Sequence, residues 1–264
     1  MINKEMTGAT LATGMATLAA NKAVAKTDSA AVDQALKALK TYDWGADRET
    51  LNPIDQAINT TYGDSAARKT LEKSLVDILV GGISRSAQDY VCRKLRIIGS
   101  GQSVSALAAL LPDEATSHIA RYALERIRNR KANAALRDAL PKVSNTLKPG
   151  IISAMGIRRD RRSTKAIAAL LGDSDIQVAR AAANSLGLIG TSAAAKALSG
   201  FAPKAPSNMK LPVADACLTC AEQFLAAGEK AEAIALYTGL KGDNQPKHIK
   251  VAAMKGMLTA ATLK

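Results

Sequence analysis

Aromatic residues are scarce in this chain of 264 residues: Phe, Trp and Tyr together make up 3%, and there is one tryptophan. Apolar residues nevertheless account for 47% of the sequence, which is enough to build a folded core and argues against disorder. That core must be filled mainly by Ala, Leu and Ile rather than by large rings. This composition favours thin layers of closely packed helices over a thick β-sandwich or barrel.

Long apolar runs and paired cysteines are also lacking. No stretch approaches the roughly 18 apolar residues that a membrane-spanning helix needs, so the sequence predicts no membrane span. The three cysteines, an odd number, provide no disulfide framework. Cys217 and Cys220 form a C-x-x-C pair inside a helical run, which places both sulfurs on one helix face. They are predicted to be two small core residues, and a redox or metal-binding role is the alternative.

The N-terminal segment, residues 1–26, is a poor secretory signal because Thr, Gly and Asn interrupt its apolar stretch. It is expected to form a first helix, and residues 9–62 are expected to contribute two or three further helices. The sequence assigns no compartment. The default is cytoplasmic, and a signal removed beforehand would make the protein an exported one.

The sequence repeats itself. Residues 103–113 (SVSALAALLPD) and 163–173 (STKAIAALLGD) share one pattern at an offset of 60. A second pattern marks a partner helix in each repeat. Its anchor residues, spaced by 29, 31 and 31 positions, are Leu95, Leu124, Met155 and Leu186. An offset of 60 is therefore two periods of about 30 residues, which is typical of stacked helical hairpins.

Each period contains two helical stripes. One helix is predicted from apolar residues at i, i+4, i+7 and i+8, namely Leu71, Leu75, Ile78 and Leu79, with a turn at residues 81–84 after it. A later one is predicted from Val178, Ala182, Leu186 and Ile189.

The ends of these helices also carry signals. Gly99 and Gly190 are expected to end helices with positive φ, as glycine commonly does after the last turn. Asp113 and Asp173 are expected to be N-caps of the second helices of their repeats, because a carboxylate accepts the unpaired N–H groups there.

The period, the paired helices and the LL-x-D and LGxIG signatures together resemble HEAT repeats, in particular the short HEAT-like type first associated with phycobilisome lyases. The resemblance is strongest at residues 166–173 and 178–190. It implies an all-α fold, a right-handed α-solenoid of stacked antiparallel helix pairs. We therefore expect an N-terminal helical cap at residues 1–65, HEAT-like repeats at 66–200 and C-terminal helical repeats or a cap at 201–264.

No catalytic constellation is present. The sequence has no GxSxG, HExxH or Walker motif, and its two histidines, His118 and His248, are 130 residues apart. The Gly-rich segment 99–103 lacks the following lysine of a phosphate loop and is interpreted as a turn between repeats. Trp44 is expected to anchor the terminal helices. The sequence thus predicts no catalytic residues, no metal site and no cofactor.

Positive charge is concentrated in one part of the chain. The whole chain carries a formal charge of +13, and residues 121–165 contain thirteen Lys or Arg against three acidic residues. Two clusters stand one period apart, so stacking of the repeats should bring them within roughly 10 Å as one basic edge. The predicted binding residues of this edge are Arg126, Arg128, Arg130, Arg158, Arg159, Arg161, Arg162 and Lys165.

Two interpretations of the basic edge remain. It is a solubilising rim whose arginines also bond the last helix carbonyls, or it binds an acidic partner through guanidinium groups. The leading functional hypothesis is a non-catalytic protein–protein interaction scaffold with an acidic protein partner. A nucleic-acid-binding or DNA-repair HEAT-like protein is the alternative, although Tyr122 is the single ring near the cluster. A chromophore-lyase-like subunit is a further alternative that the resemblance implies.

Overall fold

The computed structural model describes residues 28–242 and 245–262, and these residues contain α-helices and short 3-10 helices but no strand. The helix expected within residues 1–26 lies outside the described residues. None of the described helices combines the length and apolar character needed to cross a bilayer. By its contacts the chain divides into two compact units, residues 1–87 and 88–264.

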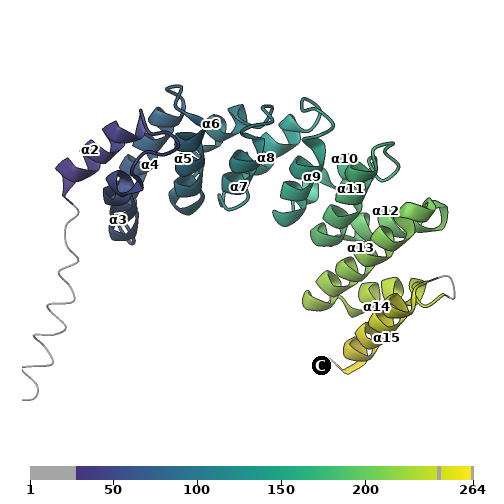
Figure 1. Cartoon of the computed structure of the whole chain (residues 1–264). Coiled ribbons are helices and arrows are strands. Elements are labelled where there is room, and N and C mark those ends of the chain that lie inside the picture. The colour runs from purple at the N-terminus through teal and green to yellow at the C-terminus, as the bar shows by residue number, and fades with distance from the viewer. Residues whose placement is uncertain (1–27, 243–244, 263–264) are drawn as a thin grey trace, which may run out of the picture. The chain divides into compact units, whose positions relative to one another are not determined.

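The first unit is a small helical cluster. It contains α2 (Ser29–Leu39), the 3-10 helix η1 (Arg48–Leu51), α3 (Asn52–Thr60) and α4 (Ser65–Leu79) (Figure 1). Asp28 and Asp64 start α2 and α4 by accepting main-chain N–H groups. The predicted apolar stripe of α4 is buried, and α4 packs against α2 and α3.

The second unit repeats a helical hairpin. Its helices are α5 (Arg85–Ile98, which begins just before the boundary), α6 (Val104–Ala109), α7 (Ser117–Leu124), α8 (Arg130–Ala139), α9 (Lys148–Ile157), α10 (Thr164–Ala168, preceded by η2, Arg161–Ser163), α11 (Ile176–Ile189) and α12 (Ser192–Phe201). They are followed by η3 (Ala202–Lys204), α13 (Ser207–Ala226), α14 (Lys230–Gly239) and α15 (Lys247–Thr262).

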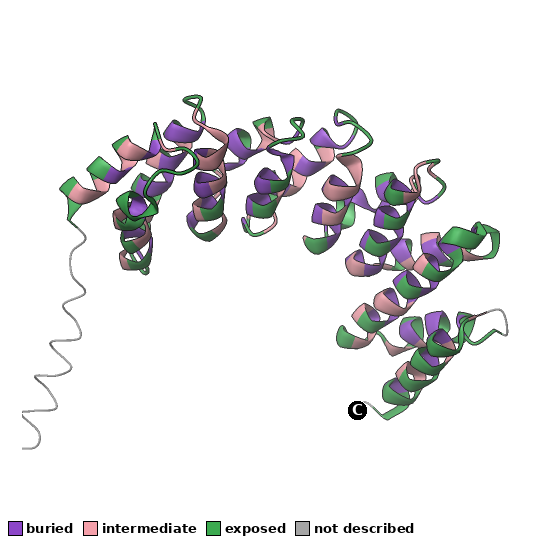
Figure 2. Ribbon diagram, viewed as in Figure 1, coloured by how far each residue is buried: buried purple, intermediate pink, exposed green. Residues whose placement is uncertain are grey.

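Helices of this unit pack in two layers. One layer joins α7 to α9, α9 to α11 and α11 to α13, while α6 packs on α8 and α10 packs on α12 in the other (Figure 1). Buried residues lie along the helix faces between neighbours, and exposed residues cover the outside (Figure 2). The predicted all-α fold of stacked helix pairs is therefore confirmed as a helical-repeat, solenoid-like architecture. The cap and repeat boundaries at residues 65 and 200 stay predictions.

Small residues bring the first layer close together. Gly156 of α9 lies against Ser185 of α11, and the Ser185 hydroxyl donates a 2.9 Å hydrogen bond to the carbonyl of Ile152. One period later Gly187 lies against the backbone of Ala216. Because neither glycine has a Cβ, the helix backbones approach closely at both contacts.

Some local expectations are wrong by a few residues. Gly190 has the expected positive φ of 58°, but Gly99 does not have a positive φ. A Cβ on Gly99 would instead meet the carbonyl oxygen of Leu95 and the side chain of Ile127, so the close approach of these groups favours glycine there. Asp113 and Asp173 are not N-caps: each accepts an N–H two residues on, in the turn before its helix, and Asp175 caps α11.

Candidate functional site at the basic turns

The two arginine clusters lie on equivalent connections of the second unit. The first basic turn, residues 125–129, leads from α7 into α8, and the second basic turn, residues 158–163, leads from α9 through η2 into α10. The first cluster consists of Arg126, Arg128 and Arg130. They follow α7, which ends at Leu124, and Arg130 is the first residue of α8.

Arg158 ties the second basic turn to the first. Its Nε donates to Asn133 Oδ1 over 2.5 Å, and its two terminal nitrogens donate to main-chain carbonyls after α7. These acceptors are the carbonyl oxygens of Leu124, Glu125 (3.2 Å), Ile127 (2.9 Å) and Asn129 (3.0 Å). One guanidinium thus supplies a donor to the carbonyls of Leu124 and Glu125 at the end of α7. It adds a second donor to the carbonyls of Ile127 and Asn129, which already accept main-chain N–H groups, and so holds the two turns side by side.

A buried carboxylate completes this connection. Asp160 is 4% exposed and accepts from Asn133 Nδ2 (3.2 Å) and from Arg137 Nη1, with which it forms an ion pair. The Asn133 amide therefore bridges Arg158 and Asp160, one through its oxygen and one through its nitrogen. The charges and the amide in this network are paired. Pairing offsets the free-energy cost of removing them from water.

Glu125 is the other acid among these cations. Burial raises its pKa, and Arg121, Arg96, Arg158 and Arg126 oppose that rise. Burial also lowers the pKa of Arg121 and of Arg158, against the attraction of Glu125 in both cases. Four arginines thus surround one half-buried carboxylate. The positive charge near Glu125 therefore exceeds the negative charge.

The remaining predicted binding residues face solvent. Arg126 lies near Glu125, while the other six side chains make no hydrogen bond or ion pair within the described part of the chain. These six, called the exposed cations below, are Arg128, Arg130, Arg159, Arg161, Arg162 and Lys165. Arg158 has to be removed from the predicted binding set, because its donors are used inside the protein.

Arg159 has an unusual backbone. Its φ of 49° makes it the one non-glycine residue with positive φ in the described segments. Arg159 N–H bonds to Gly156 O (2.8 Å) and Asp160 N–H bonds to Met155 O (3.0 Å), which is the Schellman arrangement. The same left-handed place is taken by Gly190 after α11. An arginine thus adopts a backbone conformation that glycine adopts at lower cost. Its side chain makes no internal bond that would offset this strain.

Replacing Arg159 with glycine is expected to raise the free energy of unfolding by up to about 1 kcal/mol, because glycine adopts a positive φ without the Cβ penalty. Urea denaturation followed by circular dichroism measures this change. Arg162→Gly is the matched control, since Arg162 has no positive φ and should lose stability with glycine. Equal effects of the two changes would show that the left-handed backbone at Arg159 carries no strain.

The Gly-rich segment 99–103 is a turn between α5 and α6, as interpreted from the sequence. A Cβ on Gly101 would meet the side chain of Asn129, so this turn lies against the first basic turn. Three successive connections of the second unit are therefore adjacent, and two of them carry the exposed cations.

Arg93 and Arg96 are the residues that sequence analysis missed, because it counted cations from position 121 onward. Both lie on α5, and their guanidinium carbons lie 5.8 Å and 4.2 Å from the ring centroid of Tyr122 on α7. The ring of Tyr122 is thus engaged by two cations. The repeat period of about 30 residues could have identified them, because it places α5 beside α7 and so brings Arg93 and Arg96 near Tyr122.

The other singled-out residues are accounted for structurally. Cys217 and Cys220 are buried, and burial raises their pKa values to about 11 and about 12, so both thiols are protonated at neutral pH. Within the described segments no group of His, Cys, Asp or Glu is arranged to hold a metal ion. Trp44 is 93% exposed, so the expectation that it anchors the terminal helices is wrong.

Comparisons with known proteins add a general likeness. No family model matches the chain, and no curated protein matches it. Among solved structures it is similar to an engineered protein at 18% identity and a TM-score of 0.43, over 89% of this chain and 69% of that one. A second engineered protein matches at 18% identity and a TM-score of 0.33, over 86% of this chain and 96% of that one.

Proposed function

We propose that this protein is a non-catalytic interaction module of HEAT-like repeats that binds an acidic segment of another protein at its two basic turns. The observation that carries the proposal is the pairing state of the arginines. Six exposed cations lack an internal partner, whereas Arg158 between them is fully used to fix the turns. Fixed, unpaired guanidinium groups are suited to bidentate capture of carboxylates.

A protein partner is favoured over nucleic acid because residues 121–165, which carry the basic turns, contain one aromatic ring. Tyr122, 39% exposed, is the one aromatic residue between positions 121 and 165, and Arg93 and Arg96 already occupy its surroundings. Proteins that bind single-stranded nucleic acids combine a positively charged groove with rings that stack on successive bases. Carboxylates need no ring, and the exposed cations supply the charge they require.

The test is binding of a fluorescent peptide of about twenty residues rich in Asp and Glu, measured by anisotropy at about 50 mM salt. The variant Arg128→Ser, Arg130→Ser, Arg161→Ser, Arg162→Ser removes four exposed cations and keeps Arg158. Its affinity is expected to fall by about tenfold or more, since each exposed pair contributes up to about 1 kcal/mol. A matched control removes the same charge elsewhere: Lys40→Ser, Lys69→Ser, Lys196→Ser, Lys255→Ser.

The expected result is a large loss for the arginine variant and at most a threefold loss for the lysine control. Equal losses of affinity in the two variants would show that the peptide responds to net charge and not to the basic turns. That result would overturn the proposal. So would a failure of the unaltered protein to bind the peptide at this salt concentration. A single-stranded DNA of equal charge serves as competitor. If this DNA binds much more tightly than the peptide does, the nucleic-acid alternative replaces the acidic-protein proposal.

A further inference from the structure

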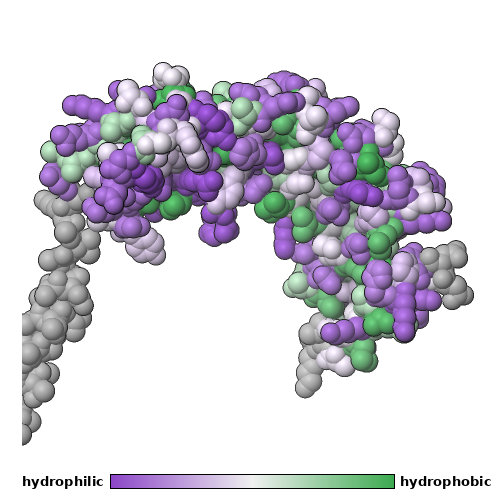
Figure 3. Space-filling model, viewed as in Figure 1, coloured by the Kyte–Doolittle hydropathy of each residue, from purple (hydrophilic) through white to green (hydrophobic). Residues whose placement is uncertain are grey.

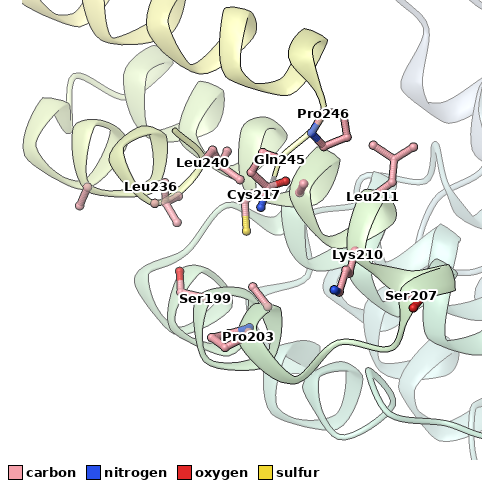
Figure 4. A pocket seen from close by; sticks show the side chains of 14 residues that line it. Ser199, Pro203, Ser207, Lys210, Leu211, Cys217, Leu236, Leu240, Gln245 and Pro246 are labelled. Carbon is pink, nitrogen blue, oxygen red and sulfur yellow. The ribbon is translucent and has the colours of Figure 1, made fainter. Parts of the chain in front are cut away.

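A cavity of about 630 Å³ lies in the second unit, remote in sequence from the basic turns. It is open to solvent on one side and is bordered by the end of α12, η3, α13, α14 and residues 245–246 before α15 (Figure 4). Much of its wall is apolar, formed by Pro203, Leu211, Ala214, Leu236, Leu240 and Pro246. This size and lining are typical of sites for small organic molecules.

Several large apolar side chains of the C-terminal helices are exposed. The space-filling view shows hydrophobic side chains on the outside over the C-terminal helices (Figure 3). Large apolar side chains exposed in α13 and α15 are Leu211, Val251, Met254 and Leu258.

A few polar groups converge on the cavity. Figure 4 shows the Ser199 hydroxyl and the Cys217 sulfur directed into the space between α12 and α13, with Lys210 on the α13 side. Among the described residues, Lys210 is the one charged residue in the lining, and none of them brings a carboxylate to oppose it. Within the described part of the chain, Lys210 makes no hydrogen bond or ion pair.

We propose that this cavity binds a small aliphatic carboxylate, with its hydrocarbon body between α13 and α14 and its carboxylate paired with Lys210. The apolar wall takes up the chain, the ammonium group selects one negative charge, and Ser199 can donate a further hydrogen bond. Because Lys210 is the one charged residue of the described lining, a cationic or zwitterionic ligand is a poor match. The proposal is independent of the acidic-partner function, because it uses none of the exposed cations.

Gly239 allows the cavity to be filled without disturbing its walls. It lines the cavity, has no positive φ, and a Cβ placed on it meets no atom within 4 Å. Gly239→Leu should therefore occupy the cavity, and its higher helix propensity should keep the fold at least as stable. Gly200→Leu is the matched control, since Gly200 also faces open space but does not line the cavity.

The experiment titrates the full chain with sodium octanoate, sodium decanoate and 1-octanol, below the concentrations at which they aggregate, by isothermal calorimetry. Decanoate is expected to bind about tenfold or more tightly than octanoate, because each buried methylene strengthens binding about three- to fourfold. Gly239→Leu should abolish binding and Gly200→Leu should leave it unchanged. Lys210→Ala should weaken decanoate about threefold to tenfold, while Lys196→Ala, an exposed lysine of α12, should not.

Three results would overturn the proposal. One is the absence of decanoate binding to the unaltered protein at millimolar concentration. Another is equal binding by Gly239→Leu and the unaltered protein, which would place the ligand elsewhere. The third is octanol binding as tightly as octanoate together with an unaffected Lys210→Ala variant, since the site would then not recognise the carboxylate.

Discussion

Replacing Arg158 with methionine is expected to lower the free energy of unfolding by about 3 kcal/mol. Among the arginines of the basic turns, no other single replacement is expected to destabilise the protein as much. The methionine keeps an apolar stem but donates no hydrogen bond. The carbonyl oxygens of Leu124 and Glu125 at the end of α7 and the side chain of Asn133 would then lose this donor. A buried polar group left without its partner costs about 1–3 kcal/mol, and several are affected at once.

Asp160 adds to the expected loss. The attraction between Asp160 and Arg158 favours the charged guanidinium, and Asn133 connects the two side chains. With methionine at position 158, the asparagine is held only by the carboxylate and the turn loses its bridge. We therefore expect the Arg158→Met variant to lose more stability than removal of one isolated surface pair would explain.

Arg162→Met is the control for this prediction. Arg162 stands four residues away, is exposed, and makes no hydrogen bond or ion pair within the described residues. Its replacement should change the free energy of unfolding by at most about 0.5 kcal/mol. Urea denaturation of both variants measures the difference. Equal stabilities would mean that the internal bonds of Arg158 do not hold the basic turns together.

Helix positions in this protein follow from local sequence alone. The stripe through Leu71 and Leu79 is buried on α4, and the stripe through Val178 and Ile189 is buried on α11, as the spacing predicted. A packed helix buries one face whichever element covers it. Apolar residues spaced with a period of 3.6 are therefore sufficient to predict the buried face. The 30-residue period then gives the stacking order, because each hairpin can bury its apolar faces only against the next one.

The roles of individual arginines did not follow from the sequence. Arg158 and Arg159 are adjacent and chemically identical, yet one guanidinium points into the protein and the other into solvent. What separates them is a helix end and Asn133, which lie 25 to 34 residues earlier in the chain. No local pattern contains that information, because it depends on which carbonyls the fold leaves unpaired.

Trp44 shows a similar limit. A single tryptophan in a chain poor in rings was expected to be buried, since large aromatic side chains usually contribute much apolar area to a core. The core of the first unit is instead filled by aliphatic residues such as Leu39, Leu51 and Leu75, which are fully buried. Trp44 lies next to Gly45, whose φ of 86° marks the turn that carries both residues. Turn geometry, rather than ring size, decides its exposure.

Gly187→Val is expected to destabilise the second unit by about 3 kcal/mol, because it separates two helices that pack through their backbones. A Cβ at this position would lie 2.7 Å from the carbonyl oxygen of Ala216 and 3.2 Å from its Cα. A backbone group within a helix of twenty residues cannot move aside as the end of a flexible side chain can. The removal of a helical glycine offsets only up to about 1 kcal/mol of this cost.

The same substitution at Gly200 provides the control. Gly200 is also helical, in α12, but a Cβ there meets no atom within 4 Å, so Gly200→Val should be neutral or slightly stabilising. Denaturation by urea measures both variants.

A buried thiol of α13 provides a second, local measurement. Cys220 is fully buried and does not line the cavity, so loosening of α13 from α11 should speed its reaction with a thiol reagent in Gly187→Val and leave it unchanged in Gly200→Val. Unchanged stability and unchanged thiol reactivity in Gly187→Val would show that the two helices have room for a side chain. Their close backbone contact would then not be what fixes the stacking of the repeats.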